Sequence, residues 1–339
     1  MRIAIANNNT AATDILLAVV SSQPGYKIAW TASNGAEAVR NAAHDKPDLI
    51  LMDLDLPVMG ELQAIQVIMK ENPCAILIVT DEVAKHASKV FEAMGRGALD
   101  AQSTPVIDRG GNIKGKEELL KKIAVIERLI GKEKLNGKNE LTAKKDVFKS
   151  FRSMIIIGSS TGGPKALTEI VSHIPDTVNV PVVIIQHVDI QFVNGLADWL
   201  ANHTKLKVAL AKEGMSPEVN TIYLASTNDH LVIGSDLAFR YVVEPKDNPY
   251  RPSVDAFFLS VAHHWHGKGV AVLLTGMGRD GAQGLLALRK LGWHTIAQDE
   301  KTSVVYGMPK AAAQIDAAKE ILPIEKIAEA VMRQIKLVT

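Results

Sequence analysis

Short apolar runs alternate along the chain with longer segments in which apolar residues recur every three or four positions. In the first third, this pattern predicts parallel strands at Arg2–Ala6, Lys27–Ala32, Leu49–Met52, Ala75–Val79 and Gly97–Gln102. The segments between them carry helical spacing, as in Thr10–Ser22. Repeated strand–helix units predict an α/β fold with a doubly wound parallel sheet, whose site lies at the carboxyl ends of the strands.

The alternation resumes at Met154 and continues to the end of the chain. It predicts buried strands at Met154–Ile157, Val180–Gln186 and Val270–Thr275, and helices at Val254–His263 and Pro323–Lys336. Two more strands, near Thr221–Ala225 and His230–Ile233, are expected to form a hairpin. The second half therefore predicts a second doubly wound sheet.

Residues 107–150 break this pattern. Within Lys116–Lys132, one helical stripe carries Leu119, Leu120, Ile123, Ile126, Leu129 and Ile130, and we expect it to bury against a neighbouring domain. Beyond it, Gly131–Ser150 mixes lysines with Gly, Asn and Thr, which predicts a solvated flexible linker. We therefore expect a first domain over 1–106, a linker over 107–150 and a second domain over 151–339.

Composition adds exclusions to this picture. A chain of 339 residues has room for two domains, and a net charge of +1 argues against a nucleic-acid partner held by phosphate contacts. Its one cysteine, Cys74, excludes an internal disulfide and suits a reducing compartment. Because Met1–Ala6 does not read as a signal peptide and no apolar run approaches a membrane span, we expect a cytoplasmic protein without direct membrane insertion.

The turn Gly158–Gly163 joins a predicted buried strand to a predicted helix. Ser160 lies at the carboxyl edge of the sheet, beside helix N–H groups that can stabilise an oxyanion, and is our candidate nucleophile. A phosphate-binding P-loop would end in Lys followed by Ser or Thr, whereas Ala166 follows Lys165 here. For the turn alone, serines that merely cap the helix stay an alternative.

Three residue types with a joint chemistry follow predicted strands: Ser160, His187 and Asp280. A neutral imidazole can take the serine proton, while a carboxylate fixes its tautomer and stabilises the imidazolium. An α/β-hydrolase would need a histidine after the acid, but His294 precedes a strand-like run and so lies at the wrong edge. Taken singly, His187 and Asp280 could also be structural residues of a strand end and a turn.

Residues 1–106 resemble a response-regulator receiver domain. The resemblance rests on PDLILMDLDLP around Asp53, on Thr80 at the end of the fourth strand, and on Gly97–Asp100 before Pro105. It implies that Asp53 accepts a phosphoryl group and that Mg²⁺ binds to an acidic pair after the first strand.

Two departures from the receiver pattern remove charge from this site. Asn7 and Asn8 replace the acidic pair, and Thr104 replaces the usual lysine. Mg²⁺ prefers carboxylate oxygens, and phosphoryl transfer depends on cations that neutralise the equatorial oxygens. Phosphorylation of Asp53 with Mg²⁺ and a degenerate receiver that only docks both stay open.

Residues 152–339 resemble the catalytic domain of chemotaxis-type protein-glutamate methylesterases, the CheB type. Five motifs occur in order: IIIGSSTGGPKAL, IIQHVD, YRPSVDAFF, LLTGMGRDGAQGL and AQDEKTSVVYGMPKAA. The amino-terminal half, through MRIAIANN, WTASNGAEAV, NPCAILIVT and VFEAMGRGALDA, looks most like the Wsp-type surface-sensing subgroup. The resemblance implies a receiver-like (βα)5 domain and a Rossmann-like methylesterase domain joined by a helical linker.

The resemblance implies that Ser160, His187 and Asp280 form a triad, with Thr161 beside the nucleophile and the Met277 N–H in the oxyanion hole. The implied substrate is a glutamate γ-methyl ester on the cytoplasmic helices of a methyl-accepting chemoreceptor. Related enzymes also deamidate glutamine. The ester step needs no metal or organic cofactor.

Two further residues of the YRPSVDAFF motif, Arg251 and Asp255, are expected to hold the catalytic loops. The resemblance also implies that the receiver packs over the esterase cleft until phosphorylation, with a CheA-type histidine kinase as phosphodonor. A different function stays open, that of an adaptor that binds receptors or a kinase and has little esterase activity.

Overall fold

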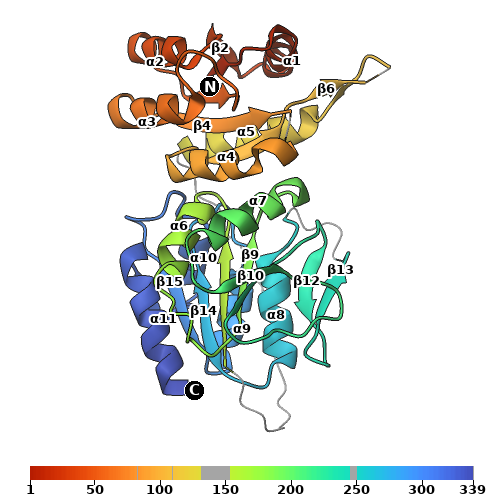
Figure 1. The fold of residues 1–339 in the computed structure, drawn as a ribbon, viewed down its shortest axis with the longest axis vertical. Coiled ribbons are helices and arrows are strands. Elements are labelled where there is room, and N and C mark those ends of the chain that lie inside the picture. The colour runs from red at the N-terminus through yellow and green to blue at the C-terminus, as the bar shows by residue number, and fades with distance from the viewer. Residues whose placement is uncertain (82, 109, 131–152, 245–249, 339) are drawn as a thin grey trace. The chain divides into compact units, whose positions relative to one another are not determined.

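The computed structural model describes the chain except residues 82, 109, 131–152, 245–249 and 339. The chain divides into two compact units, residues 1–140 and 141–339. Each unit is built on a parallel sheet with helices on both faces, as expected from the alternating pattern (Figure 1). Among the described residues, no helix is both long and apolar enough to cross a membrane.

The first unit contains a five-stranded sheet in the order β2-β1-β3-β4-β5, with every pairing parallel. Its strands are β1 (Arg2–Ala6), β2 (Lys27–Ala32), β3 (Leu49–Met52), β4 (Ala75–Thr80) and β5 (Asp100–Ser103). Its helices are α1 (Thr10–Ser21), α2 (Gly35–His44), α3 (Glu61–Glu71), α4 (Val83–Gly95) and α5 (Lys116–Ile130). A short hairpin, β6 (Val106–Ile107) and β7 (Ile113–Lys114), precedes α5.

The fifth strand begins at Asp100 and not at the predicted Gly97, because Gly97 belongs to the end of α4. Gly97 has φ +122°, and its N–H donates to Met94 O while Ala98 N donates to Ala93 O. This pair of bonds satisfies the last helical carbonyls and requires a residue that tolerates positive φ.

The apolar stripe of α5 belongs to the core of the first unit. Its buried residues are Leu119, Leu120, Ile123 and Ile126, and they pack with residues of β1, β3, β4 and α1. The prediction that this stripe buries against a neighbouring domain is therefore wrong, since α5 is the fifth helix of the receiver-like sheet. The predicted linker Gly131–Ser150 lies outside the described residues.

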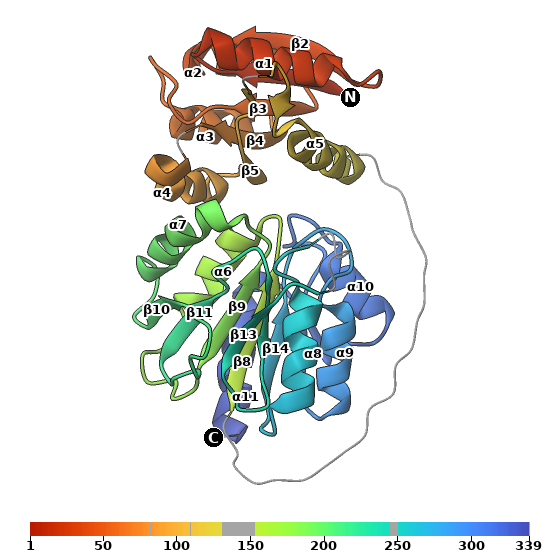
Figure 2. The same cartoon turned by 90° about the vertical axis from the view of Figure 1, so that its right-hand side faces the viewer.

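The second unit contains a seven-stranded sheet in the order β10-β11-β9-β8-β14-β15-β16, again with parallel pairings only. Its strands are β8 (Met154–Ser159), β9 (Val182–Gln186), β10 (Lys207–Leu210), β11 (Thr221–Leu224), β14 (Gly269–Leu273), β15 (His294–Gln298) and β16 (Glu320–Leu322). Its helices are α6 (Gly163–Val171), α7 (Ile190–Ala201), α8 (Val254–His264), α9 (Ala282–Lys290), α10 (Met308–Gln314) and α11 (Ile324–Val338). On one face of the sheet α6 contacts both α7 and α11, and on the other α9 contacts both α8 and α10 (Figure 2).

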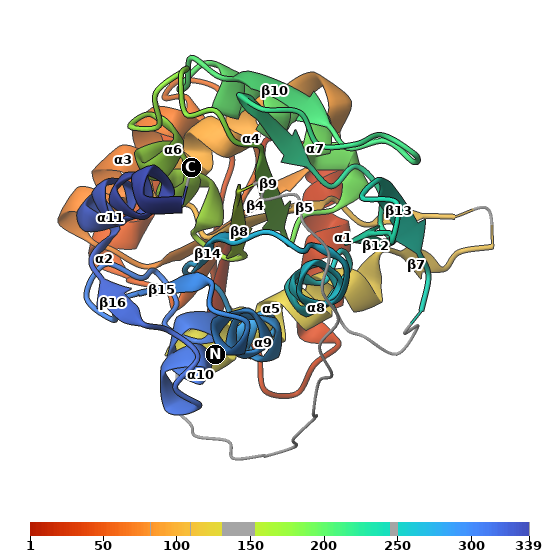
Figure 3. The same ribbon diagram turned by 90° about the horizontal axis from the view of Figure 1, so that it is seen from below.

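The predicted hairpin between Thr221–Ala225 and His230–Ile233 is wrong. β11 is completely buried and pairs in parallel with β9 and β10, whereas β12 (His230–Ile233) pairs antiparallel with β13 (Phe239–Val242). The β12–β13 hairpin lies beside α8, outside the main sheet (Figure 3). The apolar pattern of these two runs gave no sign that Thr221–Ala225 belongs inside the seven-stranded sheet.

The reversal of strand order in the second sheet fixes where a site can form. From β8 the chain proceeds to β9 on one side, and β14 later adds on the other side of β8. In doubly wound sheets, ligands and catalytic groups collect outside the carboxyl ends of the strands at such a switch point. The ends of β8, β9 and β14 are therefore the place for the predicted chemistry.

Candidate active site

The structure brings the predicted nucleophile and base to adjacent strand ends. The strands β8 and β9 are neighbours in the sheet (Figure 2). Ser160 directly follows β8 and His187 directly follows β9. His187 N donates to Ser159 O at 3.0 Å, and Ser160 N donates to Thr275 O, also at 3.0 Å. The nucleophile turn is therefore held by hydrogen bonds from both neighbouring strands.

His187 and Asp280 form a buried hydrogen-bonded pair. His187 Nε2 lies 2.7 Å from Asp280 Oδ2, and the two side chains are 9% and 5% exposed. Asp280 also accepts from the Ser253 hydroxyl at 2.8 Å and from the backbone N–H groups of Val254 and Asp255 at 2.6 and 3.0 Å. Its carboxylate therefore lies at the amino-terminal end of α8, where N–H groups and the helix dipole favour negative charge.

These contacts lower the pKa of Asp280 below its ordinary value. Burial alone would raise it, but the hydrogen bond and charge of His187, together with the Asp255 N–H and the Ser253 hydroxyl, outweigh burial. The carboxylate therefore stays ionised beside the imidazole, as is required of a group that stabilises an imidazolium.

Asp255 makes the complementary contact with the next helix. It lies in the first turn of α8, and its Oδ1 accepts from Gly284 N in α9 at 2.7 Å. Burial, and then the nearby Asp280 charge, raise the pKa of Asp255 to about 7 against the opposing backbone hydrogen bonds. The expectation that Asp255 holds the catalytic loops stays a prediction, and this contact supports it.

Ser160 and His187 are neighbours but do not share a hydrogen bond. Within the described part of the chain, the Ser160 hydroxyl has no hydrogen-bond partner, and neither does the buried His187 Nδ1. The Nδ1 edge is therefore the part of the imidazole left for proton transfer. Catalytic hydrogen bonds often tighten only when substrate is bound, so two side chains at adjacent strand ends without a mutual bond are compatible with a serine–histidine pair.

Backbone donors are available beside Ser160. Among the described residues, the N–H groups of Thr161 and Met277 have no hydrogen-bond acceptor. The Met277 loop lies close to the nucleophile, because a Cβ added to Gly276 would lie 2.7 Å from Ser160 Cβ. Thr161 and Met277 stay predicted oxyanion donors, and these two features support the assignment.

Three side chains of this site were missed as functional candidates. Tyr250 stacks on the His187 ring with centroids 4.6 Å apart and planes 11° from parallel. Ser253 binds Asp280, and Gln186 bonds both to Ser159 and to the backbone of Ser160. All three lie in quoted motifs, but a single polar residue at a strand or helix end has no periodic signal.

The phosphoryl-acceptor candidate lies at the end of β3 in the first unit. Asp53 is buried, its N–H donates to Ala6 O, and its Oδ1 accepts from Leu54 N at 2.8 Å. Burial is the largest cause that raises the pKa of Asp53 to about 6, and the charges of Asp81 and Asp55 add to it. Thr104 N donates to Thr80 O, so the predicted neighbours gather at this sheet edge.

The residues around Asp53 do not fit the usual Mg²⁺ site of a receiver. Asn7 Oδ1 accepts from Asn9 N at 2.7 Å in the turn that begins α1, and Asn8 is exposed and neutral. In the described part of the chain, no group of three or more His, Cys, Asp or Glu is arranged to hold a metal ion. We therefore assign no step to Mg²⁺.

A histidine that sequence reasoning did not single out occupies this region instead. His86 is 3% exposed; its Nδ1 lies 3.1 Å from the Thr80 hydroxyl and its Nε2 3.2 Å from Asp55 Oδ2. Its positive charge, when present, is among the influences that lower the pKa of Asp53. Thr80 is therefore already bonded to a side chain of α4.

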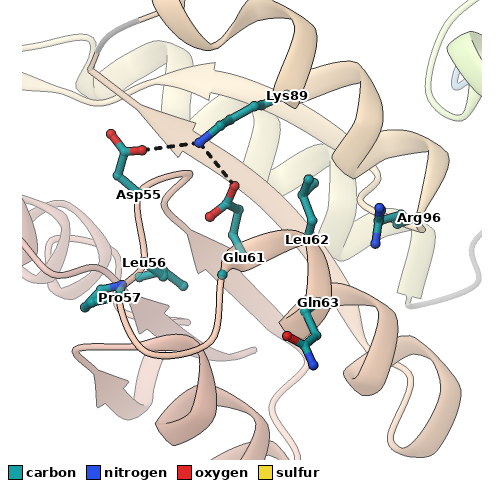
Figure 4. A pocket seen from close by; sticks show the side chains of 9 residues that line it. Asp55, Leu56, Pro57, Glu61, Leu62, Gln63, Lys89 and Arg96 are labelled. Carbon is teal, nitrogen blue, oxygen red and sulfur yellow. Dashed lines mark hydrogen bonds and ion pairs between the residues drawn. The ribbon is translucent and has the colours of Figure 1, made fainter.

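A cavity of about 600 Å³ also lies in the first unit, between the loop after β3 and helices α3 and α4 (Figure 4). Lys89 reaches toward Asp55 and Glu61, with nitrogen–oxygen distances of 3.5 and 3.7 Å. The cavity is lined by residues of this unit and contains no member of the proposed triad. We assign it no catalytic role.

A serine in a strand–helix turn, beside a buried histidine–carboxylate pair and free backbone N–H groups, is typical of serine hydrolases that form an acyl-enzyme. Comparison with known proteins specifies this class. The CheB methylesterase family matches residues 155–331, and the response regulator receiver domain family matches residues 3–106. The chain belongs to the CheB methylesterase family, with a receiver domain in its amino-terminal part.

Relatives support this assignment over nearly the whole chain. A protein-glutamate methylesterase/protein-glutamine glutaminase of Bordetella avium is 47% identical over 328 residues, covering 97% of this chain and 95% of the relative. A protein of the same name from Pseudomonas fluorescens is 48% identical and covers 97% of each chain. The crystal structure of the Thermotoga maritima CheB methylesterase catalytic domain covers 55% of this chain and all of that chain, at 34% identity and a TM-score of 0.52.

The raised pKa of Asp255 predicts how Asp255→Asn changes stability with pH. The pKa is raised from 3.8 to about 7, so the folded state holds a proton that the unfolded state has already released. The contribution of Asp255 to stability is therefore present below pH 4 and is lost as the pH rises to about 7. Asparagine keeps an acceptor for Gly284 N and cannot ionise.

We expect the melting temperature of Asp255→Asn, relative to wild type, to rise between pH 4 and pH 8. Each kcal/mol of change in the free energy of unfolding shifts the melting temperature by roughly 2–4 °C for a domain of this size. Thermal unfolding followed by circular dichroism measures it, with the exposed Asp176→Asn as the matched control. A difference that does not change with pH would show that the pKa of Asp255 is not raised in the folded protein.

The replacement of the receiver's acidic pair by Asn7 and Asn8 predicts that restoring the carboxylates increases phosphorylation. Asn7→Asp/Asn8→Asp restores carboxylates that can hold Mg²⁺ near Asp53, so we expect phosphate incorporation from acetyl phosphate to rise about tenfold or more. Radiolabel incorporation with and without Mg²⁺ measures the rate, and Asp53→Asn is the blank. Equal, Mg²⁺-dependent rates in the wild type and the double variant would mean that the two asparagines do not limit the reaction.

Proposed function

We propose that this chain hydrolyses glutamate γ-methyl esters on the cytoplasmic helices of a methyl-accepting chemoreceptor, with Ser160 as nucleophile. The observation that carries the proposal is the 2.7 Å contact between His187 and Asp280, beside the Ser160 turn. Family membership supplies the reaction class, and the relatives' names include both methylesterase and glutaminase.

The first half-reaction transfers the glutamyl group to Ser160. The Ser160 oxygen attacks the ester carbonyl while His187 takes the hydroxyl proton through the ring nitrogen that does not face Asp280. The resulting oxyanion is stabilised by the N–H groups of Thr161 and Met277. His187 then gives its proton to the departing methoxide, and methanol leaves.

The second half-reaction regenerates the enzyme. Water attacks the glutamyl ester of Ser160, His187 takes a proton from that water, and the same proton returns to the serine oxygen as the glutamate carboxylate leaves. Asp280 stays ionised throughout and stabilises the imidazolium formed in each half-reaction. A glutamine side chain follows the same path with ammonia as leaving group, which gives the glutaminase activity.

The receiver domain supplies regulation in this proposal. It restrains ester hydrolysis, and a CheA-type histidine kinase is the partner that would phosphorylate Asp53. We place the protein in the cytoplasm because the substrate glutamates lie on the cytoplasmic part of the receptor. The resemblance to the Wsp-type subgroup stays a prediction about the pathway served.

The adaptor alternative is less well supported. An adaptor with a vestigial esterase has no need of an ionised carboxylate bound to a histidine, beside free backbone donors. In this chain Asp280 receives four hydrogen bonds, from His187, Ser253, Val254 and Asp255. A buried carboxylate held in this way beside an imidazole is the arrangement that triad catalysis uses.

Ser160→Ala tests the proposed function directly. Without the hydroxyl no acyl-enzyme can form, so we expect methanol release from methylated receptor to fall by about 10³-fold or more. Gas-phase detection of methanol measures the rate, and Ser172→Ala, an exposed serine at the end of α6, is the control. Undiminished release from Ser160→Ala would favour a different nucleophile.

Deletion of residues 1–150 tests the regulatory part. If the receiver domain restrains the esterase, the truncated protein hydrolyses methylated receptor faster than the full chain at equal concentration. The catalytic domain of the Thermotoga maritima relative exists as a separate structure, which supports independent folding of this part. Equal rates for the full and truncated chains would remove autoinhibition from the proposal.

A further inference from the structure

Gln186 joins the two strand ends that carry the nucleophile and the base. It is the last residue of β9 and is 5% exposed. Its Nε2 donates to Ser160 O at 2.9 Å and to His187 O at 3.0 Å, while its Oε1 accepts from the Ser159 hydroxyl at 2.7 Å. Both donors of the amide are used, and its oxygen is bonded, so its orientation is fixed.

The bond to the Ser160 carbonyl sets the direction of a proposed oxyanion donor. The C=O of Ser160 and the N–H of Thr161 belong to one planar peptide unit and point in opposite directions. A group that fixes the carbonyl therefore fixes where the Thr161 N–H points. The same carbonyl also accepts from Gly163 N at 2.7 Å, which closes the turn.

The bond to the His187 carbonyl acts on the base in the same way. Pairing between β8 and β9 ends where His187 N donates to Ser159 O. The carbonyl of His187 lies beyond that last pairing, and Gln186 supplies its donor. The backbone at Ser160 and the backbone at His187 are thus held by one amide.

The turn is shaped to admit this amide. A Cβ added to Gly163 would lie 2.0 Å from Gln186 Oε1 and 2.9 Å from Ser159 Cβ. Any larger residue at 163 would displace the amide from Ser159. The contact between Gln186 and the nucleophile turn is therefore built into the packing and is not an incidental surface bond.

We propose that Gln186 is a positioning residue for acyl transfer, which aims the Thr161 N–H and sets the approach of His187 to Ser160. The inference rests on Ser160 being the nucleophile of the proposed function. Gln186 does not touch the reacting atoms and acts through the backbone of residues that do. Ser159 acts in turn through Gln186, by fixing the rotation of its amide.

The test measures the second-order rate of Ser160 labelling by a fluorophosphonate probe, and kcat and KM for methanol release, in the full chain. Gln186→Met keeps the size of the side chain and removes its three hydrogen bonds. We expect the labelling rate and kcat to fall about tenfold to a hundredfold with KM unchanged, because misplaced groups of this kind cost about that much. The exposed Gln314→Met is the matched control.

A double-mutant cycle separates positioning from general damage. Ser159→Ala alone should slow labelling a few-fold, and Ser159→Ala/Gln186→Met should be no slower than Gln186→Met, because Ser159 acts through the amide. Additive losses, a rise in KM at constant kcat, or wild-type labelling by Gln186→Met would each overturn the proposal. Should Gln186→Met not fold, Gln186→Glu, which keeps the acceptor for Ser159 and loses both donors, is measured against the same expectations.

The two readouts keep this inference separate from the proposed function. Wild-type protein that is labelled at Ser160 but releases no methanol contradicts the proposed substrate, while slower labelling of Gln186→Met still supports the positioning role. Wild-type protein that is not labelled at Ser160 contradicts both.

Discussion

The candidate active site depends on keeping one buried carboxylate ionised. Asp280 is almost completely covered, and burial alone would favour its neutral form. The amino-terminal end of α8 solves this problem with two backbone N–H groups and the hydroxyl of its capping residue Ser253. The negative charge of Asp280, which binds His187, is thus stabilised by α8, a helix separate in sequence from the loop that carries Asp280.

Helices α8 and α9 are each bound at their amino-terminal end by an acidic side chain that belongs to the other helix or to the loop before it. Asp280 lies two residues before α9 but binds the start of α8, and Asp255 lies in α8 but binds the start of α9. Each contact satisfies N–H groups that a helix cannot pair internally. The pairing fixes α8 against α9. The pKa of Asp280 falls because of its hydrogen bond to His187, the charge of His187 and its bonds to the start of α8, while burial and then the Asp280 charge raise the pKa of Asp255.

Much of the fold followed from apolar periodicity, and the errors have physical causes. The strands β1, β3, β4 and β8 begin where the sequence places them, because parallel strands covered on both faces are continuous apolar runs. The same run at Thr221 gave no information on its partner, so a sheet strand was predicted to form a hairpin. The stripe of α5 showed that a face is buried but not against which core.

The candidate site was partly visible in the sequence for a different reason. Ser160, His187 and Asp280 were predicted because strand ends of a doubly wound sheet converge. The contacts of Gln186, Tyr250 and Ser253 in the site form only when distant segments meet, so no spacing reveals them. In the receiver domain, the sequence showed that the acidic pair and the lysine are replaced by uncharged residues. The hydrogen bond between His86 and Thr80 became visible only in the structure.

The central claim is that Ser160 and the His187–Asp280 pair act as one unit at this sheet edge. A crystal structure of the protein phosphonylated on Ser160 tests it most directly. The account predicts the imidazole within hydrogen-bond distance, about 3 Å, of an oxygen of the adduct, with Asp280 still bound to the ring. An imidazole that stays out of reach of the adduct would contradict the account.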